Sequence, residues 1–226
     1  MWTAFRDRRE AGQRLADALL PYAPRDPVVL GLPRGGVPVA FEVARRLDAP
    51  LDVCIVRKLG APGHEEFAMG AIASGGVELL SEHTVRSLGL TREQVAQVIG
   101  RERQELARRE RAFRDGRPAV DVQGRTVILV DDGLATGASM QAAVMALRSR
   151  RPAAIVVAVP VASSTACADI RRIADVCVCL RTPEPFFGVG QWYANFGQTT
   201  DDEVRALLAA ARSPAPAPAP RPVSPV

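Results

Sequence analysis

Five short apolar runs rich in β-branched residues constrain the fold of this 226-residue chain more than any other feature. The runs are nearly continuous rather than alternating, which is typical of strands buried on both faces of a parallel sheet. Segments with helical periodicity separate them, and this order predicts an α/β fold with a mainly parallel sheet flanked by helices. The expected strands are 28–32, 51–56, 126–130, 154–161 and 176–180, and the expected helices are 9–20, 37–47, 91–114, 139–148, 165–173 and 201–211.

Two further segments have weaker or mixed signals. Residues 67–80 alternate apolar residues with three glycines, which favours two short strands in a hairpin. The helix expected from Thr91 begins with a capping-box pattern and continues with a dense mixture of Arg and Glu, including Arg101 and Glu105 four residues apart. Such a helix is expected to be solvated or to face a partner.

Composition favours a water-soluble protein. The formal charge of +4 is compatible with a nucleic-acid surface or with a site for a polyanionic small molecule. The arginines are spread along the chain among glutamates, and aromatic residues make up only 5%, which limits base stacking and argues against nucleic acid. The start of the chain shows no apolar run after its charged residues, and no apolar stretch approaches the roughly 20 residues that span a bilayer. We therefore expect a cytoplasmic protein without a membrane partner.

The cysteines and the last residues carry no catalytic signal. Cys54, Cys167, Cys177 and Cys179 form no C-x-x-C pair, and most lie among Val, Ile and Leu, as reduced core thiols do. Residues 213–226 are an alternation of Pro with Ala, which cannot build a packed core and predicts a disordered tail.

The strongest chemical signal follows the strand expected at 126–130. Two adjacent acids, Asp131 and Asp132, end this strand, and a loop of small residues then leads into a helix. Ligands bind beyond the carboxyl ends of strands in open parallel sheets. Backbone N–H groups at the helix N-terminus attract phosphate, the hydroxyls of Thr136 and Ser139 add donors, and the two carboxylates can accept hydrogen bonds from vicinal hydroxyls. The combination predicts a site for a sugar phosphate such as ribose 5-phosphate.

Residues 127–139 resemble the signature with which type I phosphoribosyltransferases bind 5-phosphoribosyl-1-pyrophosphate (PRPP). That signature has four apolar residues, two acids, two variable residues and then Ala or Asp before Thr-Gly-x-Ser/Thr. The resemblance implies the type I phosphoribosyltransferase fold, with a small hood beside the sheet. It also implies that Asp131 and Asp132 bind the ribose 2- and 3-hydroxyls. The 5-phosphate would lie against Ala135, Thr136, Gly137, Ala138 and Ser139.

Residues 32–38 extend the resemblance. They read Leu-Pro-Arg-Gly-Gly-Val-Pro between the first expected strand and the next helix, and they are similar to the pyrophosphate loop of the family. The resemblance implies that Gly35 and Gly36 expose N–H groups to the leaving pyrophosphate and that Arg34 helps to neutralise it. Taken alone, the run is equally well interpreted as a Gly-Gly turn that enters a helix.

Two cations, Arg57 and Lys58, follow the second expected strand and precede a run with Gly and Pro that is typical of a mobile loop. Family members commonly carry cations at this place, where they would neutralise pyrophosphate and magnesium-bound charge as the loop closes. Arg57 and Lys58 are thus predicted to be catalytic together with Asp131 and Asp132, and His64 is a further candidate.

Most of the aromatic residues lie at 183–196, after the last expected strand. Their rings would stack on a heterocyclic acceptor, or they would pack the hood against the core. The segment is similar to the purine-stacking Pro-x-x-Phe-x-Val-Gly of hypoxanthine-guanine phosphoribosyltransferases if Pro183 is displaced by one residue. The resemblance implies an acceptor-base site at Phe187, Val189 and Trp192.

Two positions depart from enzymes for 6-oxopurines. Ala135 stands where those enzymes have the aspartate that acts as general acid and base, and Ala194 stands where they have an acid after Gly190 of the hood. Ala135 matches the adenine, orotate and uracil branches better, but their base-specific features are not evident in this chain. The identity of the acceptor therefore stays open.

The resemblance implies a phosphoribosyltransferase of nucleotide salvage that moves the phosphoribosyl group from PRPP to a nucleobase-like acceptor and releases pyrophosphate. Mg²⁺ would be held mainly through the substrate, with Asp131 and Asp132 as candidate protein ligands. We expect a homodimer whose catalytic domain covers 1–212, with a hood from parts of 1–25 and 181–200. The alternatives are a PRPP-sensing regulator that binds nucleic acid and a specialised enzyme with an unusual acceptor; the interleaved glutamates of 101–114 favour an enzyme.

Overall fold

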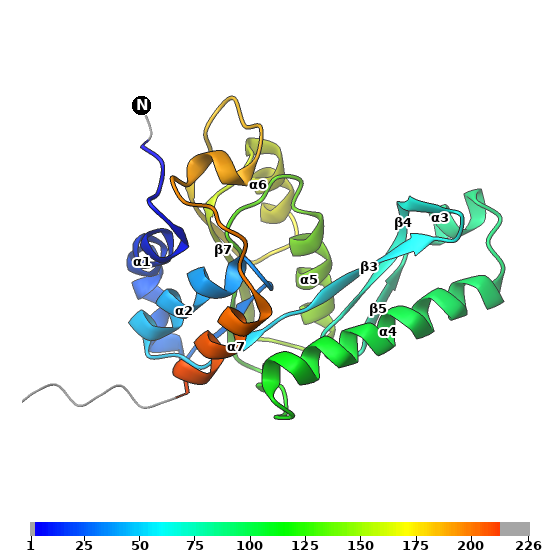
Figure 1. Cartoon of the computed structure of the whole chain (residues 1–226), viewed down its shortest axis with the longest axis horizontal. Coiled ribbons are helices and arrows are strands. Elements are labelled where there is room, and N and C mark those ends of the chain that lie inside the picture. The colour runs from blue at the N-terminus through cyan, green and yellow to red at the C-terminus, as the bar shows by residue number, and fades with distance from the viewer. Residues whose placement is uncertain (1–2, 213–226) are drawn as a thin grey trace, which may run out of the picture.

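A five-stranded parallel sheet forms the centre of the molecule in the computed structural model, which describes residues 3–212 (Figure 1). The predicted tail at 213–226 lies outside the described residues. The strands are ordered β2-β1-β6-β7-β8, and every neighbouring pair is parallel. Their bounds are β1 Val28–Gly31, β2 Leu51–Val53, β6 Thr126–Val130, β7 Ala154–Val161 and β8 Val176–Arg181. This confirms the predicted α/β architecture.

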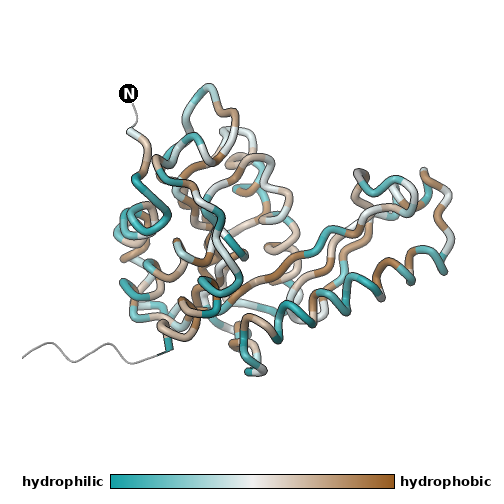
Figure 2. Tube along the Cα trace, in the orientation of Figure 1, coloured by the Kyte–Doolittle hydropathy of each residue, from teal (hydrophilic) through white to brown (hydrophobic). Residues whose placement is uncertain are grey.

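Helices cover both faces of the sheet. Neighbouring residues of the central strand β6 point to opposite sides, and the apolar side chains on each side pack against helices. Ile128 and Val130 join the apolar cluster that includes α1 and α2, whereas Val127 and Leu129 join the cluster that includes α5 and α6. All five residues of β6 are buried. Figure 2 shows the strands as apolar and the outer helices as mixed. The helices are α1 Arg8–Leu19, α2 Gly36–Leu47, α5 Ala138–Ser149, α6 Ser164–Arg171 and α7 Asp201–Ala210, with a 3-10 turn η1 at Leu20–Arg25.

A second, antiparallel sheet with two helices projects from the body as an arm (Figure 1). The strands are β3 Val56–Ala61, β4 His64–Ala73 and β5 Val77–Leu80, and the helices are α3 Glu82–Ser87 and α4 Arg92–Arg114. The predicted hairpin at 67–80 is confirmed as β4 and β5. The segment after Lys58 is a hairpin and not the expected loop, because 56–61 pair antiparallel with β4 and Pro62 and Gly63 form the turn.

Helix α4 is held on the arm by a narrow apolar stripe. Val95, Val98, Leu106 and Phe113 are buried on it and belong to the cluster that also contains Met69 of β4. The predicted capping box at Thr91 is present, with reciprocal hydrogen bonds to Gln94. The arginines and glutamates occupy the rest of the helix surface, which makes α4 the partly solvated helix that its sequence predicts.

The remaining sequence predictions for the body are largely confirmed, although the strand expected at 51–56 ends at Val53 and Val56 already belongs to β3. Five predicted helices of the body agree with α1, α2, α5, α6 and α7 to within two residues. The four cysteines are free thiols, and burial raises the pKa of Cys54 and of Cys177 to about 12, as expected for core residues. Over residues 3–212 none of the helices combines the length and the apolar character that a bilayer-spanning segment needs.

Candidate active site

Asp131 and Asp132 lie at the carboxyl edge of the central sheet, directly after β6. The backbone N–H of Asp132 donates to Asp131 Oδ1 at 2.8 Å, and Arg8 Nε donates to Asp132 Oδ2 at 2.8 Å. The Asp132 side chain is only 14% exposed. The topology therefore puts the two predicted ribose-binding acids where open parallel sheets bind ligands.

The electrostatic environment of this acid pair is unusual. Burial and the neighbouring Asp132 carboxylate raise the pKa of Asp131 well above its usual range. Burial also raises the pKa of Asp132, although Arg8 opposes this effect. Two adjacent, poorly solvated carboxylates are costly in the free protein, and hydrogen-bond donors from a ligand would offset part of that cost. The pair is thus suited to accept hydrogen bonds from hydroxyl groups.

The loop 133–137 connects the acids to α5 and opens a helix N-terminus toward the same edge. Its backbone is tied to the next crossover, since the Leu134 N–H donates to the Val161 carbonyl and Ser163 Oγ donates to the Ala135 carbonyl at 2.7 Å. Gly137 has φ of +74°, a conformation that favours glycine, and α5 begins at the next residue. The predicted phosphate-binding residues Ala135, Thr136, Ala138 and Ser139 are all exposed at this N-terminus, where Gly137 is buried.

The start of α5 fits an anion. Gly137 provides no side-chain hydrogen bond to the helix, and the Ala138 N–H donates to Thr136 Oγ1 at a long 3.4 Å. First-turn N–H groups and the helix dipole make such an end a binding site for phosphate. The backbone at the predicted 5-phosphate cradle is therefore suited to an anion.

The loop between β1 and α2 packs directly on the acid pair. A Cβ atom at Gly35 would lie 2.0 Å from Asp132 Oδ2, and one at Gly36 would lie 2.7 Å from the Val130 carbonyl oxygen. Only glycine fits at these two positions without a shift of the neighbouring backbone or carboxylate. The peptide bond between Pro33 and Arg34 is cis. The structure thus brings the predicted pyrophosphate loop against the predicted ribose-binding acids.

Arg34 reaches outward from this loop. Its NH1 atom lies 3.5 Å from Asp201 Oδ1, at the first turn of α7, and its side chain is half-exposed. Together with Arg8, Gly35 and Asp132 it lines an open pocket of about 430 Å³. The other lining residues are Phe196, Gly197, Gln198 and Thr199.

The hood combines both ends of the described chain. Phe5 and Tyr193 form a parallel bridge, with hydrogen bonds from the Phe5 N–H to the Trp192 carbonyl and from the Ala194 N–H to the Phe5 carbonyl. The ring centroids of Tyr193 and Phe196 are 5.1 Å apart. The Tyr193 hydroxyl donates to the Asp132 carbonyl at 2.6 Å, so the hood is fastened to the acid pair.

The three predicted acceptor residues have different surroundings. Val189 lies against Gly133, where a Cβ atom would be 2.6 Å from Val189 Cγ1, so this valine borders the phosphate loop. Trp192 is partly buried among the hood residues around Phe5. Phe187 is 85% exposed, which leaves its ring accessible to a ligand.

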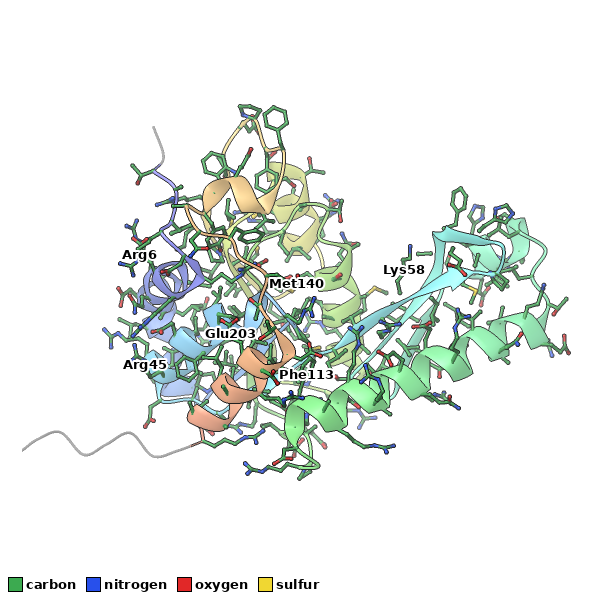
Figure 3. All side chains as sticks on the ribbon, in the orientation of Figure 1. Arg6, Arg45, Lys58, Phe113, Met140 and Glu203 are labelled. Atoms are coloured by element: carbon green, nitrogen blue, oxygen red, sulfur yellow. The ribbon has the colours of Figure 1, made fainter. Side chains whose placement is uncertain are left out.

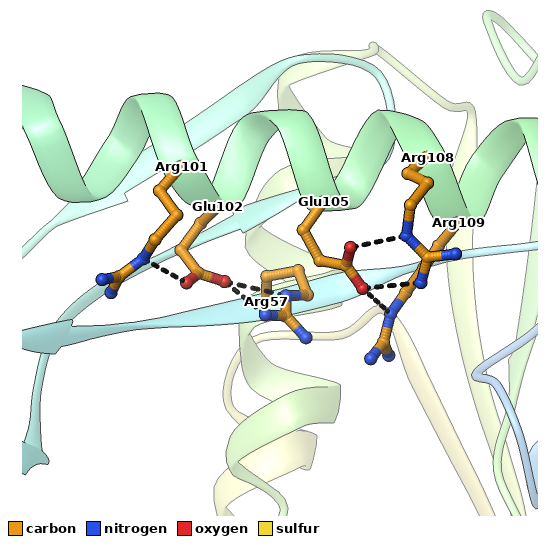
Figure 4. Close-up of polar contacts among 6 residues, drawn as sticks. All are labelled: Arg57, Arg101, Glu102, Glu105, Arg108 and Arg109. Atoms are coloured by element: carbon orange, nitrogen blue, oxygen red, sulfur yellow. Dashed lines mark hydrogen bonds and ion pairs between the residues drawn. The ribbon is translucent and has the colours of Figure 1, made fainter.

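Arg57 and Lys58 lie on β3 of the arm, on opposite faces of the strand. Arg57 donates two hydrogen bonds to Glu102 of α4, at 2.9 and 2.5 Å, in the position drawn in Figure 4. Lys58 is exposed, and Figure 3 shows it on the side of β3 away from α4. The structure does not bring Arg57 to the acid pair, because a carboxylate on the arm holds its guanidinium. His64 begins β4 near the hairpin turn and lies on the arm as well.

Several arginines of α4 are bound by neighbouring glutamates. Glu105 accepts from Arg108 Nε at 2.7 Å and from Arg109 Nε at 2.8 Å, and Arg101 contacts Glu102 (Figure 4). The two arginine contacts lower the pKa of Glu105 to about 2. Compensated charges of this kind fit a solvated helix better than a surface for a phosphate backbone.

Sequence reasoning missed three residues that touch the site: Arg8, Tyr193 and Phe196. Arg8 contacts Asp132 across 124 positions of the chain. Tyr193 and Phe196 lie in the aromatic segment that the sequence singled out, but only the fold shows which of its rings face Asp132 and Arg8. No local motif marks Arg8, since the first turn of α1 is rich in charged residues.

Comparisons with known proteins agree with this geometry. The family model described as phosphoribosyl transferase domain matches residues 8–193. A protein in two strains of Mycobacterium tuberculosis, provisionally named a phosphoribosyl transferase, is 48% identical over 207 residues, which are 92% of this chain and 47% of that protein. The chain thus spans about half the length of these curated relatives.

Among solved structures, TT1426 from Thermus thermophilus is 46% identical, with a TM-score of 0.83 over 93% of this chain and 100% of that chain. A hypothetical protein from Neisseria gonorrhoeae with bound ppGpp shares the fold at 16% identity, with a TM-score of 0.51 over 94% of this chain and 97% of its own. The fold is the type I phosphoribosyltransferase fold, and the chain belongs to the phosphoribosyl transferase domain family.

Proposed function

We propose that this protein transfers the 5-phosphoribosyl group of PRPP to a nucleobase-like acceptor and releases pyrophosphate. One observation carries the proposal. The acid pair after β6, the α5 N-terminus and the Gly35–Gly36 turn meet at one edge of the sheet, with the glycine turn packed on the acids. Three groups of a single donor, a 5-phosphate, a ribose and a pyrophosphate, match the α5 N-terminus, the acid pair and the glycine turn respectively.

Each element has a distinct task in the proposed reaction. The N–H groups at the start of α5 bind the 5-phosphate, and Asp131 and Asp132 accept hydrogen bonds from the ribose hydroxyls. The Gly35 N–H and Arg34 bind the pyrophosphate, and Gly36, whose N–H donates to the Leu32 carbonyl, allows the close approach of the turn. Catalysis then rests on orientation and charge stabilisation, because these groups fix the ribose C1 atom between the leaving oxygen and the acceptor.

The bond changes need no nucleophile from the protein. The C1–O bond to pyrophosphate breaks, and the bonding electron pair leaves with pyrophosphate. An acceptor nitrogen supplies the electron pair of the new C1–N bond and loses its proton to the medium. Arg34 is half-exposed and contacts Asp201 through NH1 at 3.5 Å, so its other donors are open to the leaving pyrophosphate.

The carboxylates of Asp131 and Asp132 fit a magnesium ion carried by the donor. Residues 3–212 contain no cluster of three or more His, Cys, Asp or Glu side chains that could hold a metal. Mg²⁺ commonly binds through one or two carboxylates together with waters and substrate phosphates rather than in a protein cage. Bound in this way, the ion would neutralise the charge that develops on pyrophosphate.

A pyrophosphate-release assay with PRPP, Mg²⁺ and a panel of purines, pyrimidines and small amines tests this function. We expect release with at least one acceptor, and loss of release in the variant that combines Asp131→Asn with Asp132→Asn. Asp175→Asn is a matched control, since Asp175 binds Arg148 and the Ile155 N–H away from the site. Retained turnover in the double variant would refute the assignment.

Ala135 of the phosphate loop and Ala194 of the hood both depart from the 6-oxopurine pattern, and no other feature identifies the acceptor. A panel that includes bases of all branches is therefore needed. A role in nucleotide salvage, a homodimer and a cytoplasmic location stay predictions. Size-exclusion chromatography with light scattering and cell fractionation test the last two.

A further inference from the structure

Arg8 occupies an unusual position at the start of α1. Asp7 caps the helix, since its side chain accepts a hydrogen bond from the Glu10 N–H, and Arg8 is the first helical residue. Side chains on helices point back toward the N-terminus. The guanidinium of Arg8 therefore extends past the helix start, where the acid pair and the end of the hood lie.

Three contacts hold this guanidinium. Its Nε donates to Asp132 Oδ2 at 2.8 Å, its NH1 donates to the Gly197 carbonyl at 2.7 Å, and its Cζ lies 4.0 Å from the centre of the Phe196 ring. The side chain is only 13% exposed. A planar guanidinium has its donors in a rigid fork and can stack on an aromatic face at the same time. One side chain thus sets the spacing between Asp132 and residues 196–197.

The ion pair between Arg8 and Asp132 lies on the side of the pocket where PRPP is proposed to bind. A Cβ atom at Gly35 would be 2.0 Å from Asp132 Oδ2 and 3.3 Å from Arg8 Nε, so the glycine turn rests on this ion pair. Gly197 and Phe196 line the same pocket as Arg8, Arg34 and Asp132. A movement of the Asp132 carboxylate would therefore be transmitted through Arg8 to the hood.

We propose that Arg8 is a positioning residue that holds the Asp132 carboxylate for the donor ribose and locks hood residues 196–197 beside it. This inference rests on the proposed function and adds a residue to it. Asp132 binds the ribose, and Arg8 acts through Asp132. Because the NH1 group of Arg8 binds Gly197, the donor half and the hood half of the site are coupled.

The hood does not depend on Arg8 for its fold. The Phe5 N–H donates to the Trp192 carbonyl, and the Asn195 N–H donates to the Arg6 carbonyl. Arg181 contacts the Thr3 carbonyl and lies 3.9 Å from the Phe5 ring centre. A variant without the Arg8 guanidinium should therefore fold, and its defect should appear in ligand binding.

The test is a calorimetric titration of PRPP with Mg²⁺ into the full chain and its variants. Arg8→Gln should weaken PRPP binding about tenfold or more, as expected for the loss of a charge-assisted hydrogen bond that orients a ligand group. Arg8→Lys keeps a cation near Asp132 but not the fork and the stacking, so it should recover part of the affinity. Arg9→Gln is the matched control, because Arg9 contacts Glu42, which Arg45 also binds.

A double-mutant cycle separates a positioning role from a structural one. In the background of Asp132→Asn, Arg8→Gln should change PRPP affinity by less than about threefold, because Arg8 has lost the group through which it acts. Equal losses in both backgrounds, or a variant Arg8→Gln that binds PRPP like the unmodified chain, would overturn the proposal while the proposed function stands. An unmodified chain that binds no PRPP would overturn both the proposal and the proposed function.

If Arg8→Gln does not fold, the Arg8→Lys variant decides alone. An unchanged PRPP affinity of Arg8→Lys would contradict the role of the guanidinium fork, and a partial loss of affinity would support it.

Discussion

Single residues of the hood differ in what surrounds their rings. Phe5 and Tyr193 are buried and pack on each other, with ring centroids 5.7 Å apart, and Phe196 stacks under Arg8. Phe187 is far more exposed, at 85%, than Phe196, at 38%, and it has no such packing partner among these rings. A large aromatic ring that contributes little to packing is available for stacking on a heterocycle. The packing interpretation of the aromatic cluster therefore applies to most of its members, and the acceptor interpretation concentrates on Phe187.

Phe187→Ala should raise the KM for the acceptor by about 5- to 30-fold, the range of a lost stacking contact of about 1–2 kcal/mol, and leave the affinity for PRPP within about twofold. Phe67→Ala is the control, because Phe67 is an exposed aromatic at 55% that lies on β4 of the arm. Steady-state kinetics with each substrate varied in turn make the distinction. Equal losses for both substrates would contradict an acceptor role and return the ring to packing.

The residues that sequence alone could identify are those in local motifs. Asp131 and Asp132 stand in one run with the strand and the helix that position them, so their placement follows from a few adjacent residues. Arg8 could not be identified in this way, because its partners Asp132 and Gly197 are 124 and 189 positions away. Arg57 shows the opposite case. Family members commonly carry a cation at its place in the sequence, but in the structure the Arg57 side chain donates to Glu102 of α4 on the arm.

At the scale of elements, the glycine turn at the start of α2 determines how closely two loops approach. A Cβ atom at Gly36 would lie 2.7 Å from the Val130 carbonyl and 2.9 Å from Asp131 Cα, and both contacts are to backbone. Backbone at the end of a buried strand cannot move without disturbing the sheet. The turn therefore needs glycine for its approach to the acids, and the expected role of the Gly36 N–H as an anion donor is wrong, because that N–H donates to the Leu32 carbonyl at 3.0 Å.

Gly36→Ala should lower the free energy of unfolding by about 1–3 kcal/mol, as overpacking does, and should also abolish turnover by moving the turn off the acids. Gly100→Ala is the matched control, since nothing lies within 4 Å of a Cβ atom at this helical position of α4. That variant should be more stable by about 0.5–1 kcal/mol, because alanine favours a helix interior. Urea unfolding measures the stability of both variants, and the pyrophosphate-release assay measures their turnover. A Gly36→Ala protein with unchanged stability and activity would show that the two loops are not in tight contact.

The elements themselves were predictable to different degrees. Buried strands such as β6 and capped helices such as α4 have a strong periodic or terminal signal, and their bounds agree with the sequence to within two residues. Strand β3 was missed, because Gly60, Pro62 and Gly63 suggested a loop. The pairing of β3 with β4 depends on the whole arm, where α4 covers one face of the hairpin, and such tertiary packing overrides local preference.

At the scale of the whole molecule, the site collects segments that are far apart in the chain. The start of α1, the turn before α2, the loop after β6 and the hood segment around residue 196 all line or border one pocket. The parallel order of the sheet makes this convergence possible, because β1 and β6 are neighbours and both end at the same edge. The arm stands apart from this edge (Figure 1), and its charged groups are largely compensated within it.

The central claim is that these segments form one PRPP site, and its most direct test is a titration of PRPP with Mg²⁺ followed by isothermal calorimetry. We predict saturable binding of one PRPP per chain to the unmodified protein. The variant that combines Asp131→Asn with Asp132→Asn should bind at least about 100-fold more weakly, since each lost charged acceptor costs about 1.5–3 kcal/mol. Absence of binding to the unmodified protein, or equal affinity for the double variant, would contradict the account.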